Sequence, residues 1–339
     1  MQQIINFLEY KMTVQEVQTT LGLTKVIGKL NLPIDQTIKD IKEYFSQTEY
    51  TPIFSQEKDR HVVQFGIFKK VDARPKYWLN ILLFIATILT TTIAGYLNSG
   101  DLLSGVIFSI SIMAILTCHE LGHYFVSKKA GMITSLPYFI PLPGGPVGTF
   151  GAVIQMKSIV PSRKALLKVG MAGPICGFLV AVPIAIIGIM LSQTMALAEG
   201  MRYMRLGDSL LFYILGKLLH PNLAPGTDIF LHPMAFAGWI GFLVTSINLI
   251  PIGQLDGGHV AHSVMLQKQK YLYPPIIAGM VILGFLWIGW FFWVLLAFYI
   301  ARREPMIQDA ITPLTKKERL LALIPLFVWI LTFIPRPFF

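Results

Sequence analysis

The sequence TCHELGHYF, residues 117–125, lies in an apolar run that begins near Leu102. On an α-helix, His119 and His123 stand one turn apart on nearly the same face, so both imidazoles can bind one zinc ion. Glu120 lies beside them, in the place where H-E-x-x-H hydrolases have a general base. Such side chains are costly at lipid depth and usually serve a site there. The stretch therefore predicts a metal-dependent hydrolytic site inside a membrane helix.

The composition indicates a protein that lies largely in lipid. Of its 339 residues, 54% are hydrophobic and 14% are charged, and the mean hydropathy is +0.62. The net charge of +10 does not indicate nucleic-acid binding, because most of the Lys and Arg residues flank apolar runs. Cys118 and Cys176 both fall in predicted spans, so no disulfide framework is expected. We expect a multi-pass membrane protein whose partner is the lipid bilayer, with no nucleic acid.

Residues 1–74 are more polar and predict a soluble α+β module of β-α-β-β order. The module closes with the basic residues Lys69, Lys70, Arg74 and Lys76, which precede the first apolar span. Basic residues before a span favour the cytoplasmic side, so the N-terminus is expected in the cytoplasm of a cell with the protein in its inner or plasma membrane. The second span then runs inward, and its metal motif lies within the membrane near the cytoplasmic side.

The segment 130–165 is too rich in Pro and Gly to be a span, and 150–156 alternates as a strand or hairpin does. Backbone at membrane depth must pack on protein or line an aqueous cavity. One interpretation is an edge strand that pairs with an extended peptide substrate. The other is a re-entrant loop that only packs. In the first case the candidate substrate-binding residues are Gly148, Phe150, Gly151, Ala152 and Ile154.

A third span covers about 166–191. In it Gly173 and Gly177 have small-xxx-small spacing, which predicts close helix packing. Farther on, residues 274–301 can form one tilted span or a hairpin broken between Gly284 and Gly289. The hairpin is favoured because it keeps the basic residues after it on the cytoplasmic side.

The fourth apolar run, 233–252, leads into a candidate third metal ligand. A hydrolytic zinc site needs three protein ligands and an open position for water. Asp256 is the favoured partner of the two histidines, because the acidic residues between Glu120 and Asp256 all lie in the loop on the outer side. His259 and His262 are competing ligands by type, since either would also complete a zinc triad. Asn248, shortly before, can hold a substrate carbonyl or an oxyanion.

Three motifs together resemble a known family. HELGH at 119–123, GPICG at 173–177 and NLIPIGQLDGGH at 248–259 are similar to the site-2 protease family of intramembrane zinc metalloproteases. The likeness covers roughly 25–335 and is greatest to the branch shared by bacteria, archaea and chloroplasts. We expect no PDZ-like insertion in the loop on the outer side and no CBS-like tail. The functions that these features have in some relatives are therefore not carried over.

The resemblance implies a transmembrane zinc metalloprotease domain at 75–339 with its core at 102–262. It implies one Zn2+ held by His119, His123 and Asp256, with Glu120 as the base and Asn248 as a substrate contact. The loop at 148–156 resembles the family's membrane-re-entrant β-loop. The expected fold is a multi-pass α-helical membrane protein with about six spans, one of which can be a short hairpin, this β-loop and a small N-terminal α+β module.

The predicted reaction is hydrolysis of a peptide bond in or near the transmembrane segment of a single-span membrane-protein substrate. Two other functions use the same residues. A membrane metal-ion transporter also carries His and Glu in its helices, but it needs further ligands to pass the ion on. A catalytically idle homologue would bind membrane proteins without cutting them. The sequence does not predict an oligomeric state.

Overall fold

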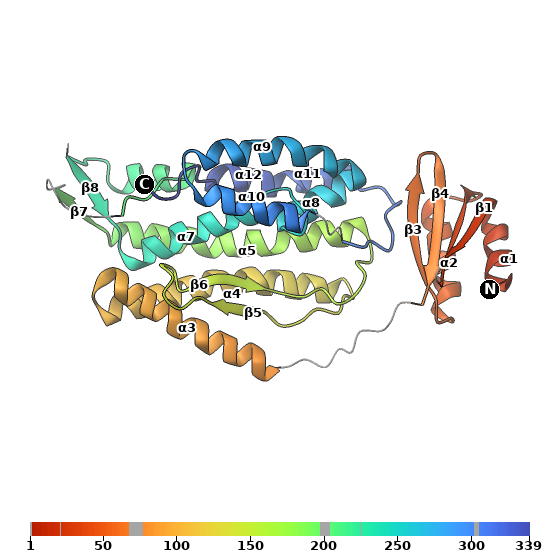
Figure 1. Cartoon of the computed structure of the whole chain (residues 1–339), viewed down its shortest axis with the longest axis horizontal. Coiled ribbons are helices and arrows are strands. Elements are labelled where there is room, and N and C mark those ends of the chain that lie inside the picture. The colour runs from red at the N-terminus through yellow and green to blue at the C-terminus, as the bar shows by residue number, and fades with distance from the viewer. Residues whose placement is uncertain (1, 21, 68–76, 197–203, 225, 302–304) are drawn as a thin grey trace.

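The chain forms a small sheet domain followed by a long bundle of helices (Figure 1). The structure is a computed structural model and describes all residues except 1, 21, 68–76, 197–203, 225 and 302–304. Lys69, Lys70 and Arg74, and with them the predicted boundary after residue 74, lie outside the described residues. The two regions are described below as residues 2–66 and 77–339.

The N-terminal region is a four-stranded antiparallel sheet with two helices. Its elements are α1 (Gln2–Lys11), β1 (Met12–Thr20), β2 (Leu23–Leu30), α2 (Ile34–Ser46), β3 (Thr51–Glu57) and β4 (Arg60–Gly66), and the strand order is β1-β2-β4-β3. The predicted β-α-β-β order is present as β2 to β4. Helix α1 and strand β1 were not predicted from the sequence. Most of β1 is exposed and polar, so it has no hydrophobic alternation by which to recognise a strand.

A segment from the far C-terminal part of the chain, residues 306–311, joins this sheet to the helices. The Phe54 N–H donates to the Gln308 carbonyl at 2.7 Å, and the Ala310 N–H donates to the Phe54 carbonyl at 3.1 Å. The segment therefore extends the sheet in parallel at its β3 edge. Ile311 enters the core of the N-terminal region. Covering an edge strand in this way satisfies its backbone groups.

The other side of the same segment binds the helical region. The Val160 N–H donates to the Met306 carbonyl at 3.0 Å, and the Gln308 N–H donates to the Val160 carbonyl at 2.7 Å. Ile307 is buried in a cluster with Val160 and Val169. The two regions are thus connected by backbone pairing as well as by the chain itself.

Among the described residues, three helices are long and apolar enough to cross a membrane: α3 (Tyr77–Ser99), α4 (Leu102–Lys129) and α5 (Arg163–Met190). They match the first three predicted spans. The other helices are α6 (Leu210–Leu219), α7 (Pro233–Asn248), α8 (Asp256–Met265), the 3-10 helix η1 (Leu266–Leu272), α9 (Tyr273–Gly284), α10 (Gly289–Ile300), α11 (Lys316–Leu321) and α12 (Leu323–Thr332). The predicted break between Gly284 and Gly289 is present, with α9 and α10 packed on each other.

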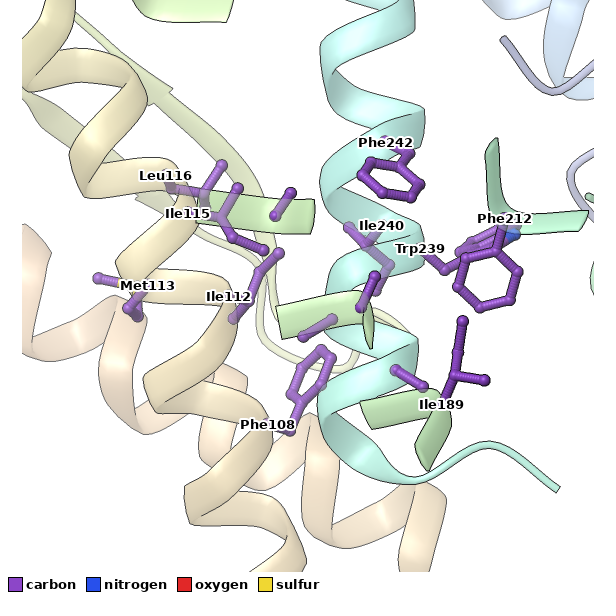
Figure 2. Packing of buried hydrophobic residues seen from close by; sticks show 14 of the residues in the cluster. Phe108, Ile112, Met113, Ile115, Leu116, Ile189, Phe212, Trp239, Ile240 and Phe242 are labelled. Atoms are coloured by element: carbon purple, nitrogen blue, oxygen red, sulfur yellow. The ribbon is translucent and has the colours of Figure 1, made fainter. Parts of the chain in front are cut away.

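The core of the bundle lies where α5 packs between α4 and α7. Figure 2 shows Ile112 and Ile115 from α4 on the side of Ile240 from α7, and these three side chains are at most 3% exposed. Helix α3 packs on the N-terminal part of α4, where Gly95 of α3 lies against Gly105 of α4. Small residues at such crossings allow the helix backbones to approach closely.

Two small two-stranded sheets lie between the helices. Strands β5 (Tyr138–Pro141) and β6 (Thr149–Val153) pair antiparallel between α4 and α5, and β7 (Gln193–Ala196) pairs with β8 (Thr227–Phe230) at the other end of α5. Hairpin β5–β6 contains the predicted strand and lies beside α3 and α4 (Figure 1). At its turn, Gly148 has φ +78° and rests against the backbone of Thr90 on α3. A side chain there would overlap that backbone, so Gly148 is explained by packing.

Ala310→Pro tests the link between the two regions. Proline removes the Ala310 N–H and leaves the Phe54 carbonyl without its donor, which costs about 1–3 kcal/mol. We expect faster hydrogen exchange along β3 and a lower melting temperature for the N-terminal region. Gln308→Ala is the control, because it changes a side chain and keeps every backbone bond. Equal exchange in both variants would show that this pairing does not hold the regions together.

Candidate metal centre

Helix α4 places three of the predicted site residues in the centre of the bundle. His119, Glu120 and His123 are 4–6% exposed although all three are polar. The two imidazoles project from one face of the helix, and their Nε2 atoms lie 3.2 Å apart. The helical spacing predicted from the sequence is therefore present, and the surrounding protein shields these side chains from lipid.

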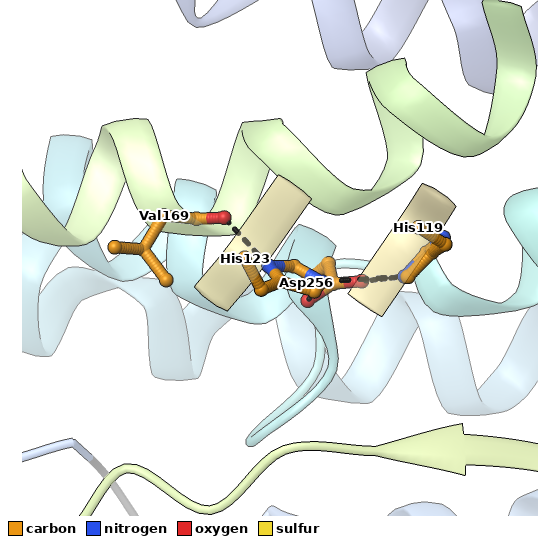
Figure 3. A network of polar contacts seen from close by, with 4 residues as sticks. All are labelled: His119, His123, Val169 and Asp256. Carbon is orange, nitrogen blue, oxygen red and sulfur yellow. Dashed lines mark hydrogen bonds and ion pairs between the residues drawn. The ribbon is translucent and has the colours of Figure 1, made fainter. Parts of the chain in front are cut away.

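Asp256, the first residue of α8, completes the group. Its Oδ2 lies 3.2 Å from His119 Nε2 and its Oδ1 lies 3.2 Å from His123 Nε2 (Figure 3). Neighbouring ligand atoms of a tetrahedral zinc ion with bonds of 2.0–2.1 Å lie about 3.3 Å apart. The separation of the two imidazole nitrogens matches this value, and Asp256 presents one carboxylate oxygen to each of them. Two imidazoles and a carboxylate are also the ligand types of a hydrolytic zinc site that keeps one position open.

A backbone carbonyl orients one of the two imidazoles. His123 Nδ1 lies 2.8 Å from the Val169 carbonyl oxygen on α5 (Figure 3). Because a carbonyl oxygen only accepts, Nδ1 carries the proton and donates, which leaves the lone pair on Nε2 free. Metal-binding histidines characteristically have such a second contact. The role of Val169 was not predicted. Every residue has a backbone carbonyl, so no residue type in the sequence indicates this contact.

The two glycines predicted for helix packing lie under the imidazole rings. A β-carbon at Gly173 would overlap the His123 ring, and one at Gly177 would lie 3.1 Å from His119 Nδ1. Gly122 on α4 makes the backbone contact instead, since a β-carbon there would lie 2.7 Å from the Ala172 carbonyl oxygen. The small residues of α5 thus make room for the rings between the two helices.

The β5–β6 hairpin reaches this group at Glu120. The backbone N–H of Ile154, directly after β6, faces the Glu120 carboxylate. Phe150 is 68% exposed and Gly151 has φ +98°, whereas Ala152 is half-buried against the bundle core. The residues predicted for the loop therefore differ in their surroundings, and the one in contact with Glu120 is Ile154.

The remaining candidates lie close by but outside the group of three. In the part of the chain that the structure describes, the His, Cys, Asp and Glu side chains that could share one metal ion are His119, His123 and Asp256. His259, the competing ligand, has its β-carbon against Gly170 of α5. Asn248 ends α7, one residue before Leu249, whose carbonyl oxygen contacts Gly257 of α8. This contact brings the end of α7 next to the start of α8.

The sequence model described as peptidase family M50 matches residues 107–288, which is more than half of the chain and includes the whole group. The chain belongs to peptidase family M50. The predicted resemblance to site-2 proteases is thereby confirmed.

Curated relatives of this M50 member carry names of the same kind. It is 32% identical over 228 residues to "Probable zinc metalloprotease EGY2, chloroplastic" of Arabidopsis thaliana, covering 66% of this chain and 40% of the relative. It is 29% identical over 232 residues to "Probable zinc metalloprotease EGY1, chloroplastic" of Oryza sativa subsp. japonica, covering 66% and 39%. The chain thus spans about two fifths of the length of these relatives. No solved structure matches it.

Asp256→Ala and His259→Ala test the third ligand. Asp256→Ala removes an oxygen 3.2 Å from each imidazole, so we expect low zinc content and lost activity. His259→Ala removes a ring outside this group and should largely retain zinc. Metal analysis of both purified proteins decides between them. The reverse pattern would give the ligand role to His259.

Proposed function

We propose that this M50 member is an intramembrane zinc metalloprotease that hydrolyses peptide bonds in or near transmembrane segments. The observation that supports it best is that one ligand atom each from His119, His123 and Asp256 lies within 4.8 Å of the others, which suits three protein ligands around one zinc ion. Glu120 follows His119 directly in the sequence, where a hydrolase of this type has its base.

In this proposal the residues of the site divide the work of hydrolysis. His119, His123 and Asp256 hold the zinc, which when bound polarises the scissile carbonyl and activates a water molecule. The Glu120 carboxylate accepts the proton of that water and returns it to the leaving amine. Burial of Glu120 keeps bulk water away from this transfer. Asn248, at the end of α7, holds the substrate carbonyl or the oxyanion.

The β5–β6 hairpin is the proposed substrate contact. A peptide bond in a transmembrane helix is shielded by the helix's own hydrogen bonds, so the substrate must unwind before it is cut. Hairpin backbone offers replacement bonds to an extended segment. Because the Ile154 N–H already reaches Glu120, a strand added at this edge would lie next to the base.

The proposed setting is a membrane with about six crossings and a re-entrant β-loop. Three long helices support the membrane location, and α7, the α9–α10 hairpin counted as one, and α12 would supply the further crossings. Residues 1–74 would form a cytoplasmic module and 75–339 the protease domain, with a core at 102–262. We place the protein in the inner or plasma membrane, with the site nearer the cytoplasm and single-span membrane proteins as substrates.

A metal transporter is the less favoured alternative. It needs a series of ligand groups along a pathway, whereas the described residues contain the group of His119, His123 and Asp256 and no second one. The relatives' printed names also refer to proteases. An idle homologue would have no need of a complete ligand set beside a buried glutamate.

Glu120→Gln is the most direct test of the reaction. The amide keeps the shape of the side chain but cannot accept the proton, so we expect zinc content to stay normal and cleavage to fall by at least about 100-fold. Cleavage is followed with a purified single-span substrate in detergent or vesicles. Near wild-type cleavage by this variant would exclude Glu120 as the base.

Ile154→Pro tests the hairpin. Proline removes the N–H that faces Glu120 and disfavours strand pairing, whereas Ile154→Ala only shortens the side chain. We expect Ile154→Pro, and likewise Ala152→Pro, to lose cleavage while keeping zinc, and Ile154→Ala to lose less. Melting temperatures accompany the assay because proline can also disturb the hairpin itself. Equal cleavage by the proline and alanine variants at equal stability would leave the hairpin a packing role only.

A further inference from the structure

Asp256 lies in the first turn of α8, where the helix has little local stabilisation. Asp256 is the first residue of this ten-residue helix, and the cap position, Leu255, makes no side-chain cap bond. Gly257 and Gly258 follow, and glycine lowers helix stability at each position. Both glycines are needed, because β-carbons there would overlap the carbonyl oxygens of Leu249 and Gly253. The start of α8 therefore depends on contacts from elsewhere to stay fixed.

Gln269 of η1 supplies two such contacts. Its side-chain nitrogen donates to the Gly258 carbonyl at 3.1 Å and to the Pro251 carbonyl at 3.3 Å. The two carbonyls can only accept, so the amide nitrogen must face them, and its two hydrogens serve both. Gln269 is 2% exposed. One buried amide thus joins the loop before Asp256 to the helical turn after it.

The chain reverses sharply to bring Gln269 there. Leu266, between α8 and η1, has φ +51° and ψ −134°, a backbone conformation that residues other than glycine rarely adopt. Such strain persists only where the surroundings hold it in place. Here η1 packs back along α8, and the reversal places the Gln269 side chain beside the first turn.

Arg163 holds the other end of α8. Its Nε donates to the Ser263 carbonyl at 2.8 Å and its Nη2 donates to the Val264 carbonyl at 2.9 Å. A guanidinium at the last carbonyls of a helix satisfies groups that lack partners within the helix and complements their partial negative charge. Arg163 starts α5, the helix whose Val169 carbonyl orients His123. The same helix therefore fixes the orientation of His123 and the far end of the Asp256 helix.

We propose that Gln269 is a positioning residue that holds Asp256 in reach of His119 and His123, with Arg163 as its counterpart at the other end of α8. This rests on the proposed zinc site. Neither residue contacts the group of three in the structure; both act through the backbone of α8. The sequence gives little sign of this role, because Gln269 lies in the polar stretch LQKQK, which is typical of a surface connection.

The test is the zinc affinity of the full-length protein in detergent, measured by competition with a chelator. Gln269→Met keeps the length of the side chain and removes both donors. Gln267→Met makes the same change at an exposed position of η1 and is the matched control. We expect Gln269→Met to bind zinc about tenfold more weakly, as the loss of an outer contact at a metal site typically does, and Gln267→Met to match wild type.

A second readout separates positioning from general stability. Bound Co2+ in place of zinc should change its visible spectrum in Gln269→Met, because displacement of the Asp256 oxygens alters the coordination geometry. A purely structural role would lower the melting temperature of the metal-free protein and leave affinity and spectrum unchanged. That result would overturn the proposal, as would equal weakening by Gln267→Met.

Arg163→Lys keeps the test valid if Gln269→Met does not fold. Lysine keeps the charge but cannot make both bonds of the guanidinium in the same geometry. We expect weaker zinc binding than in wild type, and unchanged binding would overturn the proposal. Absence of zinc binding by the wild-type protein would instead refute the proposed function itself, so the two failures are distinguishable.

Discussion

The contact of the α4 imidazoles with the glycines of α5 is the constraint on which the centre of this protein depends. His119 and His123 lie directly over Gly177 and Gly173, where larger residues would meet the rings. The Val169 carbonyl, one turn away on α5, accepts from His123 Nδ1 at 2.8 Å. Helix α5 therefore sets both the distance and the orientation of the rings. Any shift of α5 along α4 would break these contacts together.

The polar group is tolerated in an apolar bundle because its members satisfy one another. His119 and His123 each lie 3.2 Å from an oxygen of Asp256, and the Ile154 N–H faces Glu120. Burying such groups without partners would be costly. Around them the aliphatic and aromatic side chains shared by α4, α5 and α7 form a tightly packed cluster. That packing gives the polar side chains few alternative positions.

The site is also tied to the periphery by backbone contacts. Residues 306–311 pair with Phe54 of the N-terminal sheet on one side and with Val160, just before α5, on the other. Val160 and Ile307 share a buried cluster with Val169, whose carbonyl meets His123. A continuous set of packed residues therefore runs from the N-terminal sheet to the metal centre. The arrangement gives the N-terminal region a fixed place relative to α5.

Elements that depend on a local pattern could be predicted from the residues alone. The four-residue spacing of His119 and His123 follows from the helical repeat, and the long apolar runs become α3, α4 and α5 because their length and composition suffice. The break between Gly284 and Gly289 was also readable, since the basic residues beyond it favoured a hairpin. Strand β1 could not be predicted in this way, because its mostly exposed polar residues have no hydrophobic alternation.

Which residues meet at the site depends on the packing of segments that are far apart in the chain. His259 and Asp256 are both plausible ligands by type, and the packing of Gly257 and Gly258 turns Asp256 toward the histidines. The backbone groups of Val169 and Ile154, and the buried amide of Gln269, act at or near the site without any motif. Their roles arise from contacts between segments far apart in the chain. A local pattern cannot encode such contacts, since every residue carries the same backbone donor and acceptor.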